Sequence, residues 1–341
     1  MEQFISGLRR DRLPIIIVAV FIVVATAVRI YYGFAPFKLS SFLNNSAIIA
    51  SGLFGLASVW TLFKLVKERP DSPIIFLRTN PVVRNVFARL PGLLPILFAQ
   101  ALFMPTFSAM KLLVGKMFPY TWDQLFIYWD VVLHGDHAWI YLQPFIGHAA
   151  ITSGIALVYH IWILYLYLAF PMVCFWRGNP IRREQLLVSY FLCWIIIGVV
   201  MANGLASVGP FALESIKSDL TFTPLMNYLY QAGEVFPVLT LDVQETLLVW
   251  HQLRDDGLGR GISAMPSMHV SIAMLFAIFG WHVSKRIGLI LTVVFLLILL
   301  GSVHLGYHYA VDGYVAIVAT FIIWITAGLF VKSSTFKTSA H

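Results

Sequence analysis

Long, unbroken apolar runs alternate with short basic segments along most of the chain. The runs lack the strict alternation of a membrane β-strand, and each is long enough to cross a bilayer as a helix of about 20 residues. In hydrocarbon every backbone polar group must be satisfied within the structure, which a helix does by itself. The pattern therefore predicts eight membrane-spanning helices, over residues 14–34, 45–66, 90–115, 150–176, 185–208, 264–283, 286–303 and 307–331.

Composition narrows the class of protein further. Of the 341 residues, 59% are hydrophobic and only 11% are charged, whereas soluble domains are about half apolar and about a quarter charged. This excludes a soluble enzyme, a disordered chain and a nucleic-acid-binding module. We therefore predict an all-α, polytopic membrane protein.

The lysines and arginines mark one side of the predicted spans as cytoplasmic. With the N-terminus inside, sixteen of them fall in inner segments and five in outer segments, as the positive-inside rule expects. Both termini of this multi-pass cell-membrane protein are therefore predicted to be cytoplasmic. The net charge of +7 then faces the cytoplasm and anionic lipid headgroups rather than nucleic acid.

Polar residues gather at the opposite, extracytoplasmic ends of three spans. The fifth span leaves the membrane at 206–210, the sixth begins within 264–271 and the eighth begins within 304–312. Two long outer segments, 116–149 and 209–263, are apolar only in part and are predicted to lie at the membrane interface. Topology alone thus predicts a polar site near the outer leaflet that these segments cover.

His308 and Asp312 form the first candidate pair in this site. They are four residues apart, so a helix would place them on one face. The carboxylate then accepts a hydrogen bond from one imidazole nitrogen and leaves the other nitrogen as a nucleophile or a base.

Pro266, Ser267 and His269 open the sixth span. Proline suits a first helical turn, Ser267 offers a hydroxyl and a backbone N–H, and a helix N-terminus attracts anions. His269 is then close to any phosphate held there. Two imidazoles that face one phosphorus atom allow a two-step displacement, in which one attacks and the other protonates the leaving oxygen.

Other histidine arrangements give competing interpretations. A histidine inside a span, such as His160, is more often a packing residue, and His308 with Asp312 alone would also fit a hydrogen-bonded pair between helices. His304 and His308 have the spacing of a zinc-binding pair. No additional Cys or Glu completes such a ligand set, so we expect neither a metal nor another cofactor.

Two motifs resemble those of a known family. Ala264-Met-Pro-Ser-Met-His269 and His308-Tyr-Ala-Val-Asp312 are similar to the second and third signature motifs of the type 2 phosphatidic acid phosphatase (PAP2) superfamily. By motif, His308 resembles the nucleophile of the family and Asp312 the residue that orients it. His269 resembles the general acid, and Ser267 a phosphate-binding group.

The resemblance also implies how the chain is organised. It covers roughly residues 90–331, which would form a catalytic domain with a six-helix core. Residues 1–89 would add a pair of spans with a basic cytoplasmic loop, and residues 332–341 a cytoplasmic tail. Weaker cues resemble the inositol phosphorylceramide synthase branch, namely Asp123-Gln-Leu-Phe, Asp130-Val-Val-Leu-His-Gly135 and Gly209-Pro210.

The chain departs from the phosphatase pattern in its cations. The first signature, a Lys six residues before Arg-Pro, is absent, and Gly209-Pro210 stands near its place; Ser302 replaces the Arg of the third motif. Each missing charge-assisted contact with phosphate is worth about 1.5–3 kcal/mol. The predicted substitutes are Arg254, Arg260 and a protonated His304.

The resemblance implies phosphoester chemistry on a lipid phosphate or phospholipid at the outer leaflet, through a phosphohistidine. With water as the acceptor the protein is a lipid phosphatase, and with a lipid alcohol it is a phosphotransferase. Two other interpretations stay open. One is a transporter or flippase that uses the His and Asp residues as a proton relay, and the other is an inactive scaffold that has kept the fold.

The predicted topology can be tested by cysteine labelling in intact cells. We expect Leu258→Cys to react with a membrane-impermeant thiol reagent from outside, because segment 209–263 is predicted to be extracytoplasmic. Pro180→Cys should react only after the cells are permeabilised. Labelling of position 180 alone in intact cells would invert the assignment.

Overall fold

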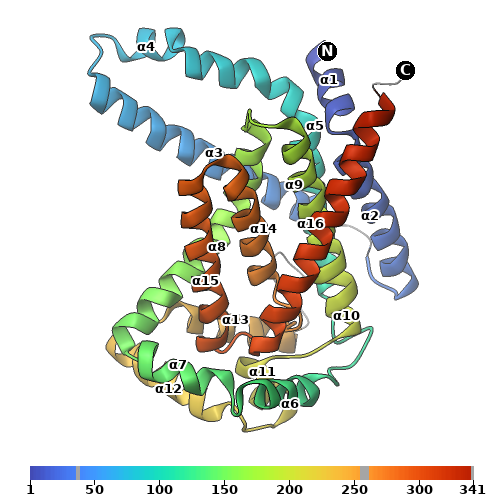
Figure 1. Cartoon of the computed structure of the whole chain (residues 1–341), viewed down its shortest axis with the longest axis vertical. Coiled ribbons are helices and arrows are strands. Elements are labelled where there is room, and N and C mark those ends of the chain that lie inside the picture. The colour runs from blue at the N-terminus through green and yellow to red at the C-terminus, as the bar shows by residue number, and fades with distance from the viewer. Residues whose placement is uncertain (36–38, 254–260, 339–341) are drawn as a thin grey trace. The chain divides into compact units, whose positions relative to one another are not determined.

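The helices follow the apolar runs of the sequence. The structure, a computed structural model, describes residues 1–35, 39–253 and 261–338. These residues form sixteen α-helices and one π-helix, and no strand occurs among them (Figure 1). The predicted all-α fold class is therefore confirmed.

Seven helical segments of the described chain are long and apolar enough to cross a membrane. They are α2 (Arg12–Tyr31), α3 (Leu39–Glu68), α5 (Pro81–Lys111), the part Ala149–Leu166 of α8 (Ala149–Phe175), the segment Pro180–Gly204, α15 (Lys285–His304), and the part Ala310–Ser333 of α16 (Ala310–Thr338). The predicted sixth span forms α14 (Met268–Val283), which is apolar but only 16 residues long. A polytopic helical membrane protein is thus confirmed, with seven long helices and one short helix where eight spans were predicted.

The segment Pro180–Gly204 changes its helical register along its length. It consists of α9 (Pro180–Leu192), the π-helix η1 (Cys193–Met201) and the short α10 (Ala202–Gly204). A π-helix is wider than an α-helix and occurs frequently at functional sites. This one leads into the polar segment 206–210.

Two serines mark where the helices of the α14–α15 hairpin begin. The Ser267 hydroxyl accepts the Val270 N–H at 3.4 Å, and the Ser284 hydroxyl accepts the Ile287 N–H at 3.2 Å. Both are the N-cap bonds that start a helix. A Cβ added at Gly280 would lie 3.2 Å from the Gly288 Cα, so small residues allow the two helices to approach closely.

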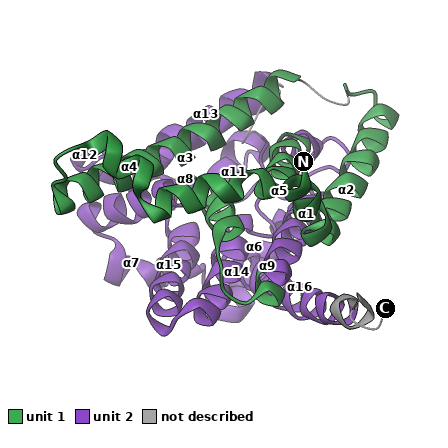
Figure 2. Cartoon of the chain, turned by 90° about the horizontal axis from the view of Figure 1, so that it is seen from above, with its two compact units in different colours: residues 1–106, 164–183 green, residues 107–163, 184–341 purple. Residues whose placement is uncertain are grey.

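The chain divides into two units (Figure 2). The first contains Met1–Thr106 and Leu164–Arg183, with the terminal helix α1 (Glu2–Arg10) and the short α4 (Pro73–Thr79). Its buried Asp11 accepts a hydrogen bond from Arg183 Nη1 at 2.6 Å. The second unit contains Phe107–Ile163 and Glu184–His341, and it holds every candidate site residue that the structure describes.

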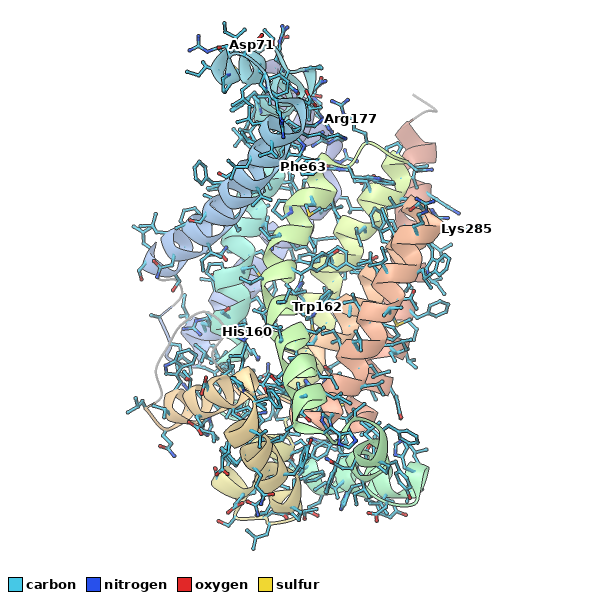
Figure 3. The ribbon with its side chains drawn as sticks, turned by 90° about the vertical axis from the view of Figure 1, so that its left-hand side faces the viewer. Phe63, Asp71, His160, Trp162, Arg177 and Lys285 are labelled. Atoms are coloured by element: carbon cyan, nitrogen blue, oxygen red, sulfur yellow. The ribbon has the colours of Figure 1, made fainter. Side chains whose placement is uncertain are left out.

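The described residues of the two long outer segments form five short helices of the second unit. These are α6 (Asp123–His134), α7 (Ala138–Ile146), α11 (Pro210–Lys217), α12 (Thr223–Val235) and α13 (Leu239–Leu253). In Figure 1, α6, α7, α11 and α12 lie where α15 passes into α16. Lys285, at the start of α15, lies at the opposite end of that helix (Figure 3).

Candidate active site

Three segments that are far apart in the sequence meet where α14 and α16 begin. The Ala264 N–H donates to the Ser207 carbonyl at 3.0 Å, and the Phe211 N–H donates to the Gly306 carbonyl at 2.8 Å. The Ser267 N–H donates to the Asp312 carbonyl at 3.2 Å. These bonds bring together the ends of the fifth, sixth and eighth predicted spans.

His308 and Asp312 are buried side by side at this junction. The His308 Nδ1 lies 3.2 Å from the Asp312 Oδ2, with 6% of His308 and none of Asp312 exposed. The sequence predicted that both lie on a helix, but α16 begins only at Ala310, so His308 precedes it. Asp312 instead folds back from the first turn, where its Oδ2 also accepts the Tyr309 N–H at 3.1 Å. A carboxylate that reaches back to the start of its helix in this way is one half of a capping box.

The surroundings of His308 favour the neutral imidazole. Burial lowers the pKa of His308, a hydrogen bond with the Ala264 backbone opposes this shift, and the positive charge of Lys111 reinforces it. A neutral imidazole carries a lone pair on one of its two nitrogens, and in the tautomer with its proton on Nδ1, toward Asp312, that lone pair is on Nε2. The group can therefore act as a nucleophile without first losing a proton to water.

His269 lies near His308, in the first turn of α14. The two side chains are close enough for a charge on His308 to act on His269. The His269 ring packs against Tyr159 with their centroids 4.9 Å apart, and Tyr159 in turn stacks on Tyr307 at 5.2 Å. These aromatic contacts fix the direction in which the second imidazole faces.

The polar groups of Ser267 have local partners. Its hydroxyl caps α14, and its backbone N–H is bonded to the Asp312 carbonyl. The Ser267 backbone N–H, which we predicted to bind a phosphate, therefore already joins the second and third motifs. The hydroxyl proton remains to be donated, because in the cap the oxygen serves as an acceptor.

The three predicted cation substitutes have different outcomes. Arg254 and Arg260 lie outside the described residues. His304 is fully buried, and its Nε2 lies 2.9 Å from the Thr152 Oγ1, which in turn lies 2.6 Å from the Tyr228 hydroxyl. His304 thus joins a polar cluster with α8 and α12, and its Nδ1 has no hydrogen-bond partner within the described part of the chain.

Lys111 is a site residue that the sequence analysis missed. It ends α5, it is partly buried, and its positive charge acts on both His269 and His308. Six residues separate it from Phe118-Pro119, which is the spacing of the first superfamily signature. Lys111 with Phe118-Pro119 therefore resembles that signature, with a phenylalanine in place of its arginine.

Two further histidines lie within helices of the chain. His160 lies along α8 (Figure 3), and His282 stacks on Trp324 with centroids 5.8 Å apart. Within residues 1–35, 39–253 and 261–338, no group of three or more His, Cys, Asp or Glu side chains is arranged to hold a metal ion.

A comparison with known families identifies the superfamily of the chain. A family model described as the PAP2 superfamily matches residues 124–326, which is more than half of the chain. The chain therefore belongs to the PAP2 superfamily. Its members are typically phosphatases that act on lipid phosphates. Neither a curated protein nor a solved structure matches the chain.

A glycine at the junction provides a test of this packing. Gly209 has φ +80°, and a Cβ there would lie 2.8 Å from both the Tyr307 carbonyl oxygen and the Ala264 Cβ. We expect Gly209→Ala to push the segments apart and to cost about 1–3 kcal/mol of stability. The measurement is thermal unfolding in detergent.

Gly204→Ala is the matched control, because nothing lies within 4 Å of a Cβ at that position. It should unfold close to the wild-type temperature. Equal unfolding temperatures for the two variants would show that the segments do not pack as described.

Proposed function

We propose that this protein is a lipid phosphate phosphatase or phosphotransferase that works through a phosphohistidine. The observation that carries the proposal is a buried imidazole held by a carboxylate, with a second imidazole within range of its charge. Membership of the PAP2 superfamily supports the same chemistry and lipid phosphates as substrates.

In the first step, His308 attacks phosphorus with Nε2, the nitrogen that Asp312 does not hold. A P–N bond forms and the P–O bond to the alcohol breaks. His269 starts this step in its protonated form and donates that proton to the departing oxygen, so that the alcohol leaves neutral and His269 is left as a neutral base. Asp312 stabilises the positive charge that develops on the attacking ring.

In the second step, a hydroxyl group attacks the phosphohistidine. The P–N bond breaks, and His269 takes back the proton from the attacking oxygen. Water as the acceptor gives a phosphatase, and a lipid hydroxyl gives a phosphotransferase. The likeness of Asp123, Asp130 and Gly209-Pro210 to the inositol phosphorylceramide synthase branch is the reason for keeping both acceptors in the proposal.

Lys111 supplies a positive charge for the phosphate oxygens in this proposal. It is the described cation whose charge acts on both imidazoles, and a phosphate between these rings would meet it. The Ser267 hydroxyl is a further donor. Arg254 and Arg260, just upstream of the second motif in the sequence, and His304 remain candidates for additional contacts with the substrate.

We also propose that the site faces the outside of the cell and that both termini are cytoplasmic. The support is the distribution of charge. Lys285 and Arg286 open α15 at one end, and His304 closes it at the other, next to the site. If basic ends are cytoplasmic, the substrate headgroup enters from the outer leaflet.

The histidine roles can be tested on the protein purified in detergent, with phosphatidic acid labelled in its phosphate and with or without a ceramide or diacylglycerol acceptor. Free phosphate would indicate a phosphatase, and a second labelled lipid would indicate a transferase. We expect His308→Ala to abolish turnover, because the nucleophile is lost. His269→Ala should lower kcat by about 10²–10⁴-fold, the usual contribution of a general acid.

His282→Ala is the matched control, since His282 lies in the last turn of the same helix, α14. It should keep the wild-type rate. Undiminished turnover in either His308→Ala or His269→Ala would remove the role assigned to that residue.

The role of Lys111 is tested in the same assay. We expect Lys111→Ala to lower kcat/KM by about 10–100-fold, the loss of one charge-assisted contact. Lys111→Arg should retain more activity than Lys111→Ala, because the charge is kept. Lys116→Ala, at an exposed position five residues later, should have little effect. Wild-type activity in Lys111→Ala, with activity lost in Arg260→Ala, would assign the cation to Arg260 instead.

A further inference from the structure

Helix α6 carries two buried carboxylates opposite an apolar outer face. Asp123 and Asp130 are seven residues apart, about two helical turns, and therefore share one face. Each has 2% of its surface exposed, whereas Tyr128 and Leu133 are largely exposed. A buried carboxylate requires hydrogen-bond donors, and the source of those donors shows what the helix holds in place.

Asp123 binds to two of the three segments that form the site. Its Oδ1 accepts the N–H groups of Val208 at 3.0 Å and Gly209 at 3.1 Å. The same oxygen accepts the Tyr309 hydroxyl at 2.9 Å. One carboxylate thus joins the exit of the fifth span to the residue that follows His308.

Asp130 binds the start of α16. Its two oxygens accept the N–H groups of Ala310 and Val311, each at 2.9 Å. The first N–H groups of a helix have no partner within that helix, and an anion near them is favourable. Here a different helix supplies the cap, two residues after His308.

We propose that Asp123 and Asp130 are positioning residues, which hold the His308–Asp312 segment in the geometry that attack on phosphorus requires. The segment is fixed from α6 at Tyr309, Ala310 and Val311. This inference rests on the proposed function, and it adds two residues that touch neither the substrate nor the reacting imidazoles.

The chemistry of the two carboxylates favours positioning over catalysis. All four of their oxygens accept protein donors. Burial raises the pKa of Asp123 and of Asp130, and the backbone donors oppose this rise. A negative charge would also repel a phosphate. Their effect on the reaction therefore passes through the backbone that they hold.

Asp130→Asn tests the inference in the full-length protein. The amide presents an N–H₂ group to one of the two backbone donors, which loses its partner. We expect kcat, measured well below the unfolding temperature, to fall by about 10–100-fold, because small misplacements of a reacting group have effects of this size. KM should stay within about threefold, since no contact with the substrate is removed. Backbone amides of residues 308–312 should exchange hydrogen faster.

Asp136→Asn is the matched control. Asp136 follows the same helix, is exposed, and accepts only the N–H of its neighbour His137 among the described hydrogen bonds. It should change neither kcat nor hydrogen exchange at 308–312. An unchanged kcat in Asp130→Asn would overturn the inference, as would unchanged exchange at 308–312.

Tyr309→Phe gives a second and milder test if Asp130→Asn does not fold. It removes one donor to Asp123 and keeps the ring that packs on Phe126 and Phe222. We expect kcat to fall several-fold at constant KM, and a wild-type kcat would contradict the inference. If the wild-type protein turns over no lipid phosphate, the proposed function fails, while hydrogen exchange still decides whether α6 holds this segment.

Discussion

The burial of the His308–Asp312 pair is the constraint on which the rest of the site depends. A histidine and a carboxylate removed from water are costly unless each polar atom has a partner. The Asp312 Oδ2 meets the His308 ring and the Tyr309 N–H, and the Asp312 carbonyl accepts the Ser267 N–H. The second carboxylate oxygen, Asp312 Oδ1, has no hydrogen-bond partner within the described part of the chain. The backbone N–H groups of Tyr307 and His308 share the Ser302 carbonyl. The nucleophile is therefore held by the turn that carries it.

The same constraint explains why distant segments build one site. No single helix can satisfy the polar groups at the junction, so 206–211, 264–267 and 304–312 use one another as hydrogen-bond partners. α6 adds the carboxylates that these backbones still require. Because the junction is buried among apolar and aromatic side chains, two charges across it interact more strongly than they would in water. Lys111 can thus influence both imidazoles.

Much of the fold was predictable because hydropathy is a local signal. Apolar runs identify spans, and the motifs around His269 and His308 are short enough to recognise directly. The sequence could not show that Ser267 caps α14 and leaves residues 264–267 outside it, because a cap depends on where the chain turns. Hydropathy also does not distinguish the π-helix at 193–201 from an α-helix.

The parts of the candidate site that escaped prediction depend on tertiary contacts. The sequence gives little sign of Lys111, because Phe118 stands at the arginine position of the signature, and only the structure brings its charge to both histidines. The sequence around Asp123 and Asp130 shows only the weak family resemblance, because nothing local indicates that their partners are the N–H groups of 208–209 and 310–311. His308 was expected on a helix and instead precedes one, because the Asp312 side chain turns back to the helix start.

The central claim is that His308 becomes covalently phosphorylated during the reaction. The most direct measurement is to mix the purified protein with a phosphate-labelled lipid, quench within milliseconds, and locate the label by mass spectrometry of peptides kept at alkaline pH. We predict a label on His308 that acid releases and that chases into product on adding acceptor. A label on His269 or on any other residue, or turnover with no protein-bound phosphate at any time, would contradict this mechanism.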